Sequence, residues 1–255
     1  MPDFRSEDAL LRYAKRLEGL RVSEISRMVC DLDRMPRNYT KGVIARIIET
    51  DYFGIPPNTY EEPDFRDLGI ELKVSPLHYV PRPGLINAKE RNVICMVDYF
   101  DIYNNPSWHD NRRLSCKLER ILFVFYLHDH GRPADQWRIL TTFLWTPNSE
   151  EDRLIQQDYD IIREKIIEGE RNSEGDNRFL GTCPKHQGGF NRQNPRDSRP
   201  GSTCEHPTMG IAERRGFCIR NVPVTIIVAR HGLNTEVVKK GRTIGIEPTD
   251  FEVLR

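Results

Sequence analysis

The chain has 255 residues, of which 38% are hydrophobic, so it is long enough for one sizeable folded domain or two small ones. Its formal charge is zero, which by itself indicates neither a nucleic-acid partner nor the absence of one. No stretch approaches the roughly 18 apolar residues of a membrane span, and the first residues lack the apolar centre of a signal peptide. The sequence therefore predicts a cytoplasmic protein without a membrane partner.

The charges are unevenly distributed along the chain. Residues 181–242 contain eleven Lys and Arg against four Asp and Glu, whereas residues 1–180 contain 26 against 31. A basic segment on a mildly acidic body is expected if one face meets a polyanion, although a solvated basic face without a partner gives the same count. Among the six cysteines, Cys30, Cys95 and Cys116 lie in apolar-rich surroundings, which favours reduced, mostly buried thiols over a disulfide framework.

Helices are expected first along the chain, and strands follow. Ser6 and the acidic residues after it precede an amphipathic segment, ALLRYAKRLEGL, and KGVIARIIET at residues 41–50 has the same apolar period. Three later segments are rich in β-branched and aromatic residues, as central strands are. These predicted strands are NVICMVDYF (92–100), CKLERILFVFYLH (116–128) and WRILTTFLW (137–145).

The second half of the chain alternates between regular and irregular patterns. A long helix is predicted from residue 149 to near Gly169, and the Gly-, Pro- and Arg-rich residues 171–210 are either a long loop region or a pair of short strands with an excursion. Apolar structure resumes at RRGFCIRN. Because no repeat or convincing linker interrupts this order, we expect one mixed α+β domain over residues 1–255, with a basic insertion at about 181–216.

The segment PDFRDLGIELKV, residues 63–74, carries a chemically informative pattern. Strand alternation places Glu71 and Lys73 on one face and the apolar residues on the other, while DLG predicts a turn that folds Asp64 back beside Glu71. Two converging carboxylates repel each other unless a hard cation such as Mg²⁺ lies between them, and a neighbouring lysine can orient or deprotonate an attacking water. The alternative is a half-exposed strand with an ordinary Glu and Lys on its solvent face.

Six segments of the chain, including the one just described, form a set of motifs: KGVIARIIE, PDFRDLGIELK, CKLERIL, FLWTPNSEEDR, CPK and RRGFCIRN. In order and spacing they resemble the MutH and GATC-cutting restriction endonuclease family. The similarity covers approximately Asp8 to Gly232. It implies one MutH-like endonuclease domain with a restriction-endonuclease-like PD-(D/E)xK core, in which helices flank a central mixed sheet, and it implies that the insertion at 181–216 reads DNA.

The resemblance also implies roles for five residues. Asp64 and Glu71 would bind Mg²⁺, Lys73 would act at the attacking water, and Glu49 and Lys117 align with a further acid and a second lysine of the family's active site. Without the resemblance, Glu49 is more readily a surface residue at a helix end. Lys117 is then a lysine at a strand edge whose ammonium extends to solvent.

Two positions depart from the family pattern. Where the mismatch-repair member has an arginine before Pro-Lys in its base-reading loop, this chain has Cys183, followed by the matching Pro184 and Lys185. Where that member has a tyrosine after Arg-Gly-Phe, this chain has Cys218. Arginine reads guanine through a bidentate pair that cysteine cannot make. The sequence therefore does not support GATC recognition or sensitivity to adenine methylation.

The basic insertion contains two further sets of candidate residues. Cys183, His186, Cys204 and His206 are a ligand set for Zn²⁺, which would stiffen the insertion. The Cys-x-His spacing is tighter than usual, and the alternative is reduced loop thiols or a histidine that contacts phosphate. The second set would contact double-stranded DNA, with bases read around Lys185 and phosphates bound by arginines. The candidates are Pro184, Lys185, Arg192, Arg196, Arg199, Arg214, Arg215 and Arg220.

The resemblance implies a sequence-specific, Mg²⁺-dependent DNA endonuclease that leaves 5′-phosphate and 3′-hydroxyl ends. The divergent reading loop favours a type II restriction enzyme, which would cut both strands as a homodimer or in two successive events. The alternative is a MutH-type mismatch-repair nicking enzyme that acts with a partner ATPase. A non-catalytic DNA-binding module is the remoter alternative, because Asp64, Glu71 and Lys73 are all present.

Overall fold

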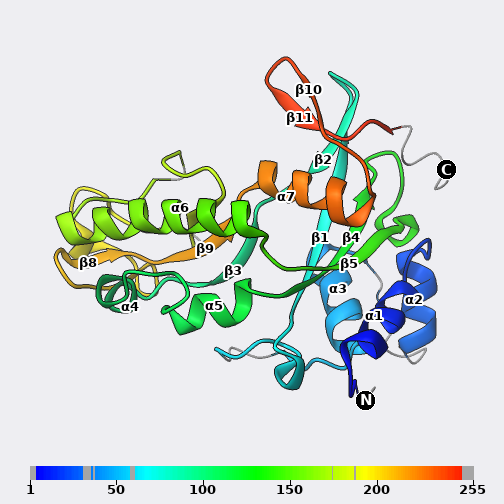
Figure 1. The fold of residues 1–255 in the computed structure, drawn as a ribbon, viewed down its shortest axis with the longest axis horizontal. Helices are drawn as coiled ribbons and strands as arrows, with labels where there is room; N and C mark the ends of the chain where they lie inside the picture. Colours follow the sequence, from blue (N-terminus) through cyan, green and yellow to red (C-terminus); the bar gives the residue numbers. More distant parts are fainter. Residues whose placement is uncertain are drawn as a thin grey trace.

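A four-stranded mixed sheet with the order β2-β1-β4-β5 lies at the centre of the computed structural model (Figure 1). The structure describes residues 4–30, 36, 38–57, 61–173, 175–186 and 188–248. Strands β1 and β4 run parallel, and the other neighbours in the sheet are antiparallel. The strands are β1 (Glu71–Val80), β2 (Leu85–Ala88), β4 (Ile121–His128) and β5 (Ile139–Trp145).

Strand β4 is buried on both faces, which explains its uninterrupted apolar sequence. Ile121, Phe123 and Phe125 belong to one apolar cluster, whereas Leu122 and Val124 belong to the other. The second cluster is completed by the amino-terminal helices and the first by the later ones. The amino-terminal elements are α1 (Glu7–Lys15), α2 (Val22–Val29), α3 (Lys41–Arg46) and the π-helical turn η2 (Ile47–Tyr52); the later helices include α5 (Arg112–Leu118), α6 (Ser149–Glu168) and α7 (Asn221–Ile227).

A second, three-stranded antiparallel sheet extends away from the central sheet, on the left in Figure 1. It has the order β3-β9-β6, and helix α6 packs against it. The predicted insertion begins in β6 and ends in β9, so it is a pair of strands with an excursion rather than a long loop. The elements of this region are β3 (Asn92–Met96), α4 (Tyr99–Asn104), β6 (Leu180–Pro184), the hairpin β7 (Thr203–His206) and β8 (Gly210–Glu213), and β9 (Arg215–Ile219).

Shorter elements complete the described chain. Three 3-10 turns and a second π-helical turn connect the main elements, and a small hairpin, at the top of Figure 1, precedes the carboxyl end of the described region. These are η3 (Arg66–Leu68), η4 (Ala134–Gln136), η5 (Pro195–Asp197), η6 (Val228–Gly232), β10 (Val238–Lys240) and β11 (Thr243–Gly245). None of the helices in the described ranges is long and apolar enough to cross a bilayer.

The predicted α+β class with a central mixed sheet and flanking helices is confirmed, but two predicted strands have wrong boundaries. Residues 116–118 end helix α5, because the Asn111 side chain caps that helix by accepting from the Leu114 N–H at 3.0 Å. Residues 99–100 begin helix α4, which Asp98 caps in the same way. The helices at Ser6 and before Gly169 are confirmed, whereas α2 was not predicted.

Candidate active site

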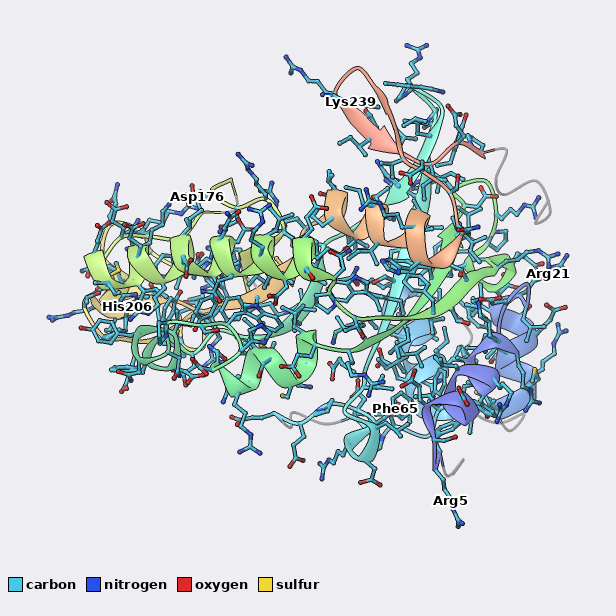
Figure 2. The ribbon with its side chains drawn as sticks, in the orientation of Figure 1. Arg5, Arg21, Phe65, Asp176, His206 and Lys239 are labelled. Carbon is cyan, nitrogen blue, oxygen red and sulfur yellow. The ribbon has the colours of Figure 1, made fainter. Side chains whose placement is uncertain are left out.

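The turn before β1 brings two carboxylates together. Gly69 adopts φ 62°, a left-handed conformation that glycine accepts without strain, and the chain reverses so that Phe65 and Ile70 form a bridge. Asp64 Oδ2 then accepts a hydrogen bond from the Leu72 N–H at 3.0 Å. Figure 2 labels Phe65, the neighbour of Asp64, at this turn below the central sheet. The turn predicted from DLG is therefore present, and it places Asp64 beside the first residues of β1.

Glu71 is the centre of the cluster, because two lysines bind its carboxylate. Lys73 Nζ lies 2.6 Å from Oε1, and Lys117 Nζ lies 3.0 Å from Oε2. Glu71 is only 3% exposed, and a buried carboxylate is tolerated when it is paired in this way. Lys117 reaches the cluster from the last turn of α5, and not from the strand on which the sequence placed it.

Glu49 approaches the same cluster from the amino-terminal helices. It lies on η2, where α3 widens into a π-helical turn, a feature that is frequent at functional sites. Glu49 and Lys73 line one cavity, and the positive charge of Lys73 opposes the effect of burial on Glu49. The structure thus brings together Glu49, Asp64, Glu71, Lys73 and Lys117, the five residues predicted as catalytic.

The electrostatics of the cluster follow from burial and from crowding of like charges. Burial, with a further contribution from Glu71, raises the pKa of Asp64. Burial raises the pKa of Glu49, while Lys73 acts in the opposite direction. Burial alone lowers the pKa of Lys73, but the adjacent Glu71 carboxylate outweighs that effect and the net pKa is raised. Lys73 is therefore an ammonium ion at neutral pH.

The donor set suits a hard divalent cation. The carboxylates of Asp64 and Glu71 supply the oxygen ligands that Mg²⁺ prefers, and a cation would relieve the repulsion that raises the pKa of Asp64. Within the described part of the chain, no group of three or more His, Cys, Asp or Glu side chains is already arranged to hold a metal ion. Both oxygens of Glu71 are bound by lysines, so coordination of a cation by Glu71 would replace one of these ion pairs.

The cluster borders a cavity of about 950 Å³. Glu49 and Lys73 contribute to the lining, and we call them the catalytic wall; residues in and directly after β6 and β9 also contribute, and we call these the reading wall. The reading wall contains three of the residues predicted to contact DNA, together with the two departures from the family pattern. Its members are Cys183, Pro184, Lys185, Cys218 and Arg220.

Arg215 does not face this cavity. It is 6% exposed, and its guanidinium donates to Thr182 Oγ1 at 2.9 Å and to the Thr182 carbonyl at 2.8 Å while it also pairs with Glu213. The structure therefore places Arg215 inside the reading wall as a support, which differs from the phosphate contact expected from the sequence. Four other predicted phosphate-binding arginines are exposed: Arg192, Arg196, Arg199 and Arg214.

The four residues proposed as zinc ligands do not form a site. His186 Nε2 lies 3.0 Å from Glu213 Oε1, whereas His206 Nδ1 accepts from the backbone N–H groups of Thr208 and Met209. Figure 2 labels His206 toward the left of the molecule, where it pairs with Gly210 at the end of the β7–β8 hairpin. Cys183 instead lines the large cavity, and Cys204 contacts the Glu213 carbonyl. The sequence spacing suggested that the four side chains meet, whereas the strand pairing gives them separate partners.

The sequence did not reveal part of the cavity lining. The turn between β2 and β3 contributes Lys89, Glu90 and Arg91, and Lys41 from α3, which also lines the cavity, forms an ion pair with Glu90. The run Ala-Lys-Glu-Arg-Asn between two apolar strands was the available signal. Its placement depends on how the two sheets are joined, which is a long-range property of the fold.

Comparison with known proteins provides independent evidence of the family that this chain resembles. Residues 53–158 match a family described as "DNA mismatch repair enzyme MutH". DNA mismatch repair protein MutH of Escherichia coli (strain K12) is 28% identical over 182 residues, which cover 71% of this chain and 76% of the relative. Over these residues the chain resembles MutH. The proteins of the same name from Shigella boydii serotype 18 and Escherichia coli O17:K52:H18 are 28% and 27% identical over the same length and coverage.

The comparisons confirm the family resemblance that the sequence motifs indicated. The matched region of this MutH-like chain runs from the end of η2 into α6. It contains Asp64, Glu71, Lys73 and Lys117, whereas Glu49 and the reading wall lie outside it.

Proposed function

We propose that this MutH-like chain is a Mg²⁺-dependent DNA endonuclease that nicks one strand, as a mismatch-repair nicking enzyme does. The observation that carries the proposal is the acid–lysine cluster on one wall of a cavity whose other wall presents Lys185 and Arg220. The relatives are named DNA mismatch repair proteins, which favours nicking over the type II restriction activity that the sequence favoured. Double-stranded DNA is the partner that these basic groups fit.

Each member of the cluster has a role that its surroundings support. When bound by Asp64 and Glu71, Mg²⁺ would stabilise the charge that develops on a scissile phosphate oxygen. Lys73, whose pKa the adjacent Glu71 carboxylate raises, would orient the attacking water and stabilise negative charge. Lys117 fixes the second oxygen of Glu71. Glu49, whose pKa burial raises, is the carboxylate suited to accept a proton from the water.

The number of active sites per chain limits what one chain can cut in a single encounter. One described chain carries one acid–lysine cluster, so a single encounter with DNA hydrolyses one phosphodiester bond. Cutting both strands requires a homodimer on DNA or two successive events. A repair nicking enzyme would also require a partner ATPase, which the family resemblance implies and which is part of the proposal.

Incubation of supercoiled plasmid with the full chain and Mg²⁺ tests the proposal. We expect nicked circles to accumulate before any linear DNA, and DNA ligase to reseal them because the ends carry 5′-phosphate and 3′-hydroxyl groups. Linear product from the first time point would favour a restriction enzyme. A mobility shift without any cleavage would leave only a DNA-binding module.

A further inference from the structure

The two departures from the family pattern, Cys183 and Cys218, lie side by side in the structure. Strands β6 and β9 pair so that Gly181 is opposite Cys218 and Cys183 is opposite Gly216. The cysteines are therefore diagonal neighbours on one face of the sheet, and both line the large cavity. Their distance along the sequence gave no indication of this contact.

Because each cysteine faces a glycine, no side chain separates the two sulfurs. A Cβ atom placed on Gly181 would lie 4.0 Å from Cys218 Sγ. The Cys218 thiol donates to the Gly181 carbonyl oxygen, which lies 3.5 Å from its Sγ. Diagonal Cα atoms are about 7–8 Å apart, slightly more than the roughly 4.4–6.8 Å that a disulfide spans. Bridging the thiols would therefore draw the strands together, and such bonds are readily reduced.

The surroundings make Cys183 the reactive member of the pair. The neighbouring Cys218 thiol lowers the pKa of Cys183 to about 6, against the opposing effect of burial, and Arg91 and Lys185 act in the same direction as Cys218. A thiolate beside basic groups at a cavity wall is the reactive form of cysteine. Burial instead raises the thiol pKa of the cysteines outside this pair for which a shift is resolved: Cys30, Cys95, Cys116 and Cys204.

We propose that Cys183 and Cys218 are a reversible oxidation site at which a low-molecular-weight disulfide, such as oxidised glutathione, switches off DNA recognition. The Cys183 thiolate attacks one sulfur of the small disulfide, whose S–S bond breaks and releases one small thiolate. Cys218 then loses its proton, and its sulfur attacks Cys183 and releases the second small thiolate. Two electrons pass from the protein to the small disulfide, and one intramolecular disulfide forms.

Closing this bond displaces the residue expected to read bases. Lys185 follows Pro184 at the end of β6, and its N–H donates to the Arg214 carbonyl at 2.9 Å. Its side chain packs over Gly216, where a Cβ would lie 2.9 Å from Lys185 Cγ. Movement of β6 against β9 therefore shifts Lys185. This consequence for cleavage rests on the proposed function, whereas the chemistry of the thiol pair does not.

Oxidised glutathione is added to the reduced full chain, which is then analysed by intact mass, by non-reducing peptide mapping and by plasmid nicking. We expect a link between the peptides of Cys183 and Cys218. We also expect nicking to slow by about tenfold or more, the effect of losing one good base contact, and to recover with dithiothreitol.

Three variants separate this mechanism from general oxidation. Cys218→Ser should trap a glutathione adduct on Cys183, because the second thiol is absent. Cys183→Ser should gain no adduct at Cys218, and its nicking rate should not respond to the oxidant. Cys30→Ser, a change outside the cavity, should behave like the unmodified chain. Each rate is compared with that of the same variant in its reduced form.

The proposal is overturned if no link between Cys183 and Cys218 forms, if a formed link leaves nicking unchanged, or if Cys183→Ser remains sensitive to the oxidant. If the reduced chain does not cut DNA at all, the proposed function fails. Peptide mapping and a DNA mobility shift, with and without the oxidant, then still decide whether the thiol pair forms and whether it controls DNA binding.

Discussion

The two walls of the cavity are built in different ways. Behind the catalytic wall, Asp64 and Glu71 join the wall residue Lys73 from one turn and one strand, so local chain geometry brings them together. Cys183 and Cys218 on the reading wall come from strands that meet only after the chain has made the β7–β8 excursion. Substitutions in the first wall should therefore impair the chemistry with little effect on folding, whereas those in the second should alter recognition or stability.

The largest expected effect is the loss of cleavage in Asp64→Asn. The amide oxygen still accepts the Leu72 N–H, so the turn is retained, but the negative charge needed by a cation is lost. We expect the nicking rate to fall by on the order of 10³-fold, with an unchanged unfolding midpoint in urea. Asp67→Asn, an exposed position on the same turn, is the matched control. Equal rates for Asp64→Asn and the unmodified chain would refute the active-site assignment.

Arg215→Ala should instead act through stability. The substitution leaves the Thr182 carbonyl and the Glu213 carboxylate without the guanidinium that now satisfies them. Breaking a buried pair of this kind costs about 3 kcal/mol, which should appear as a lower unfolding midpoint in urea. The exposed neighbour provides the control, because Arg214→Ala should leave the midpoint nearly unchanged. If Arg215 contacted phosphate instead, the stability would hold and the salt dependence of DNA binding would change.

The same contrast explains what the sequence could and could not predict. Strand alternation and a glycine-containing turn were sufficient to place Asp64 beside Glu71, because both signals are local. Lys117 was assigned to a strand, since the apolar run after it masked the helix that Asn111 caps. The support role of Arg215 and the contact of Cys183 with Cys218 depend on strand register between distant segments. No spacing along the chain encodes that register.

The raised carboxyl pKa values of the acid–lysine cluster should appear in the pH dependence of cleavage. A protonated carboxyl does not bind a cation, and the pKa values of Asp64 and Glu49 are raised, chiefly by burial. At subsaturating Mg²⁺, nicking should therefore decline as the pH falls, starting above the value of about 4 of an ordinary carboxyl. The decline should approach about tenfold per pH unit for each deprotonation required. More Mg²⁺ should move it to lower pH, and a profile independent of Mg²⁺ would contradict the assignment.

The smallest expected effect concerns a single phosphate contact. Arg196 is exposed on η5 in the basic insertion, so Arg196→Ala should weaken binding to all DNA sequences alike and reduce the salt slope by about one. Anisotropy titrations of a labelled duplex at several salt concentrations measure that slope. Arg27→Ala provides the comparison, because Arg27 is also exposed but lies on α2, among the amino-terminal helices. An equal change in slope for both variants would mean that the arginines act through net charge and that η5 makes no defined contact with the DNA backbone.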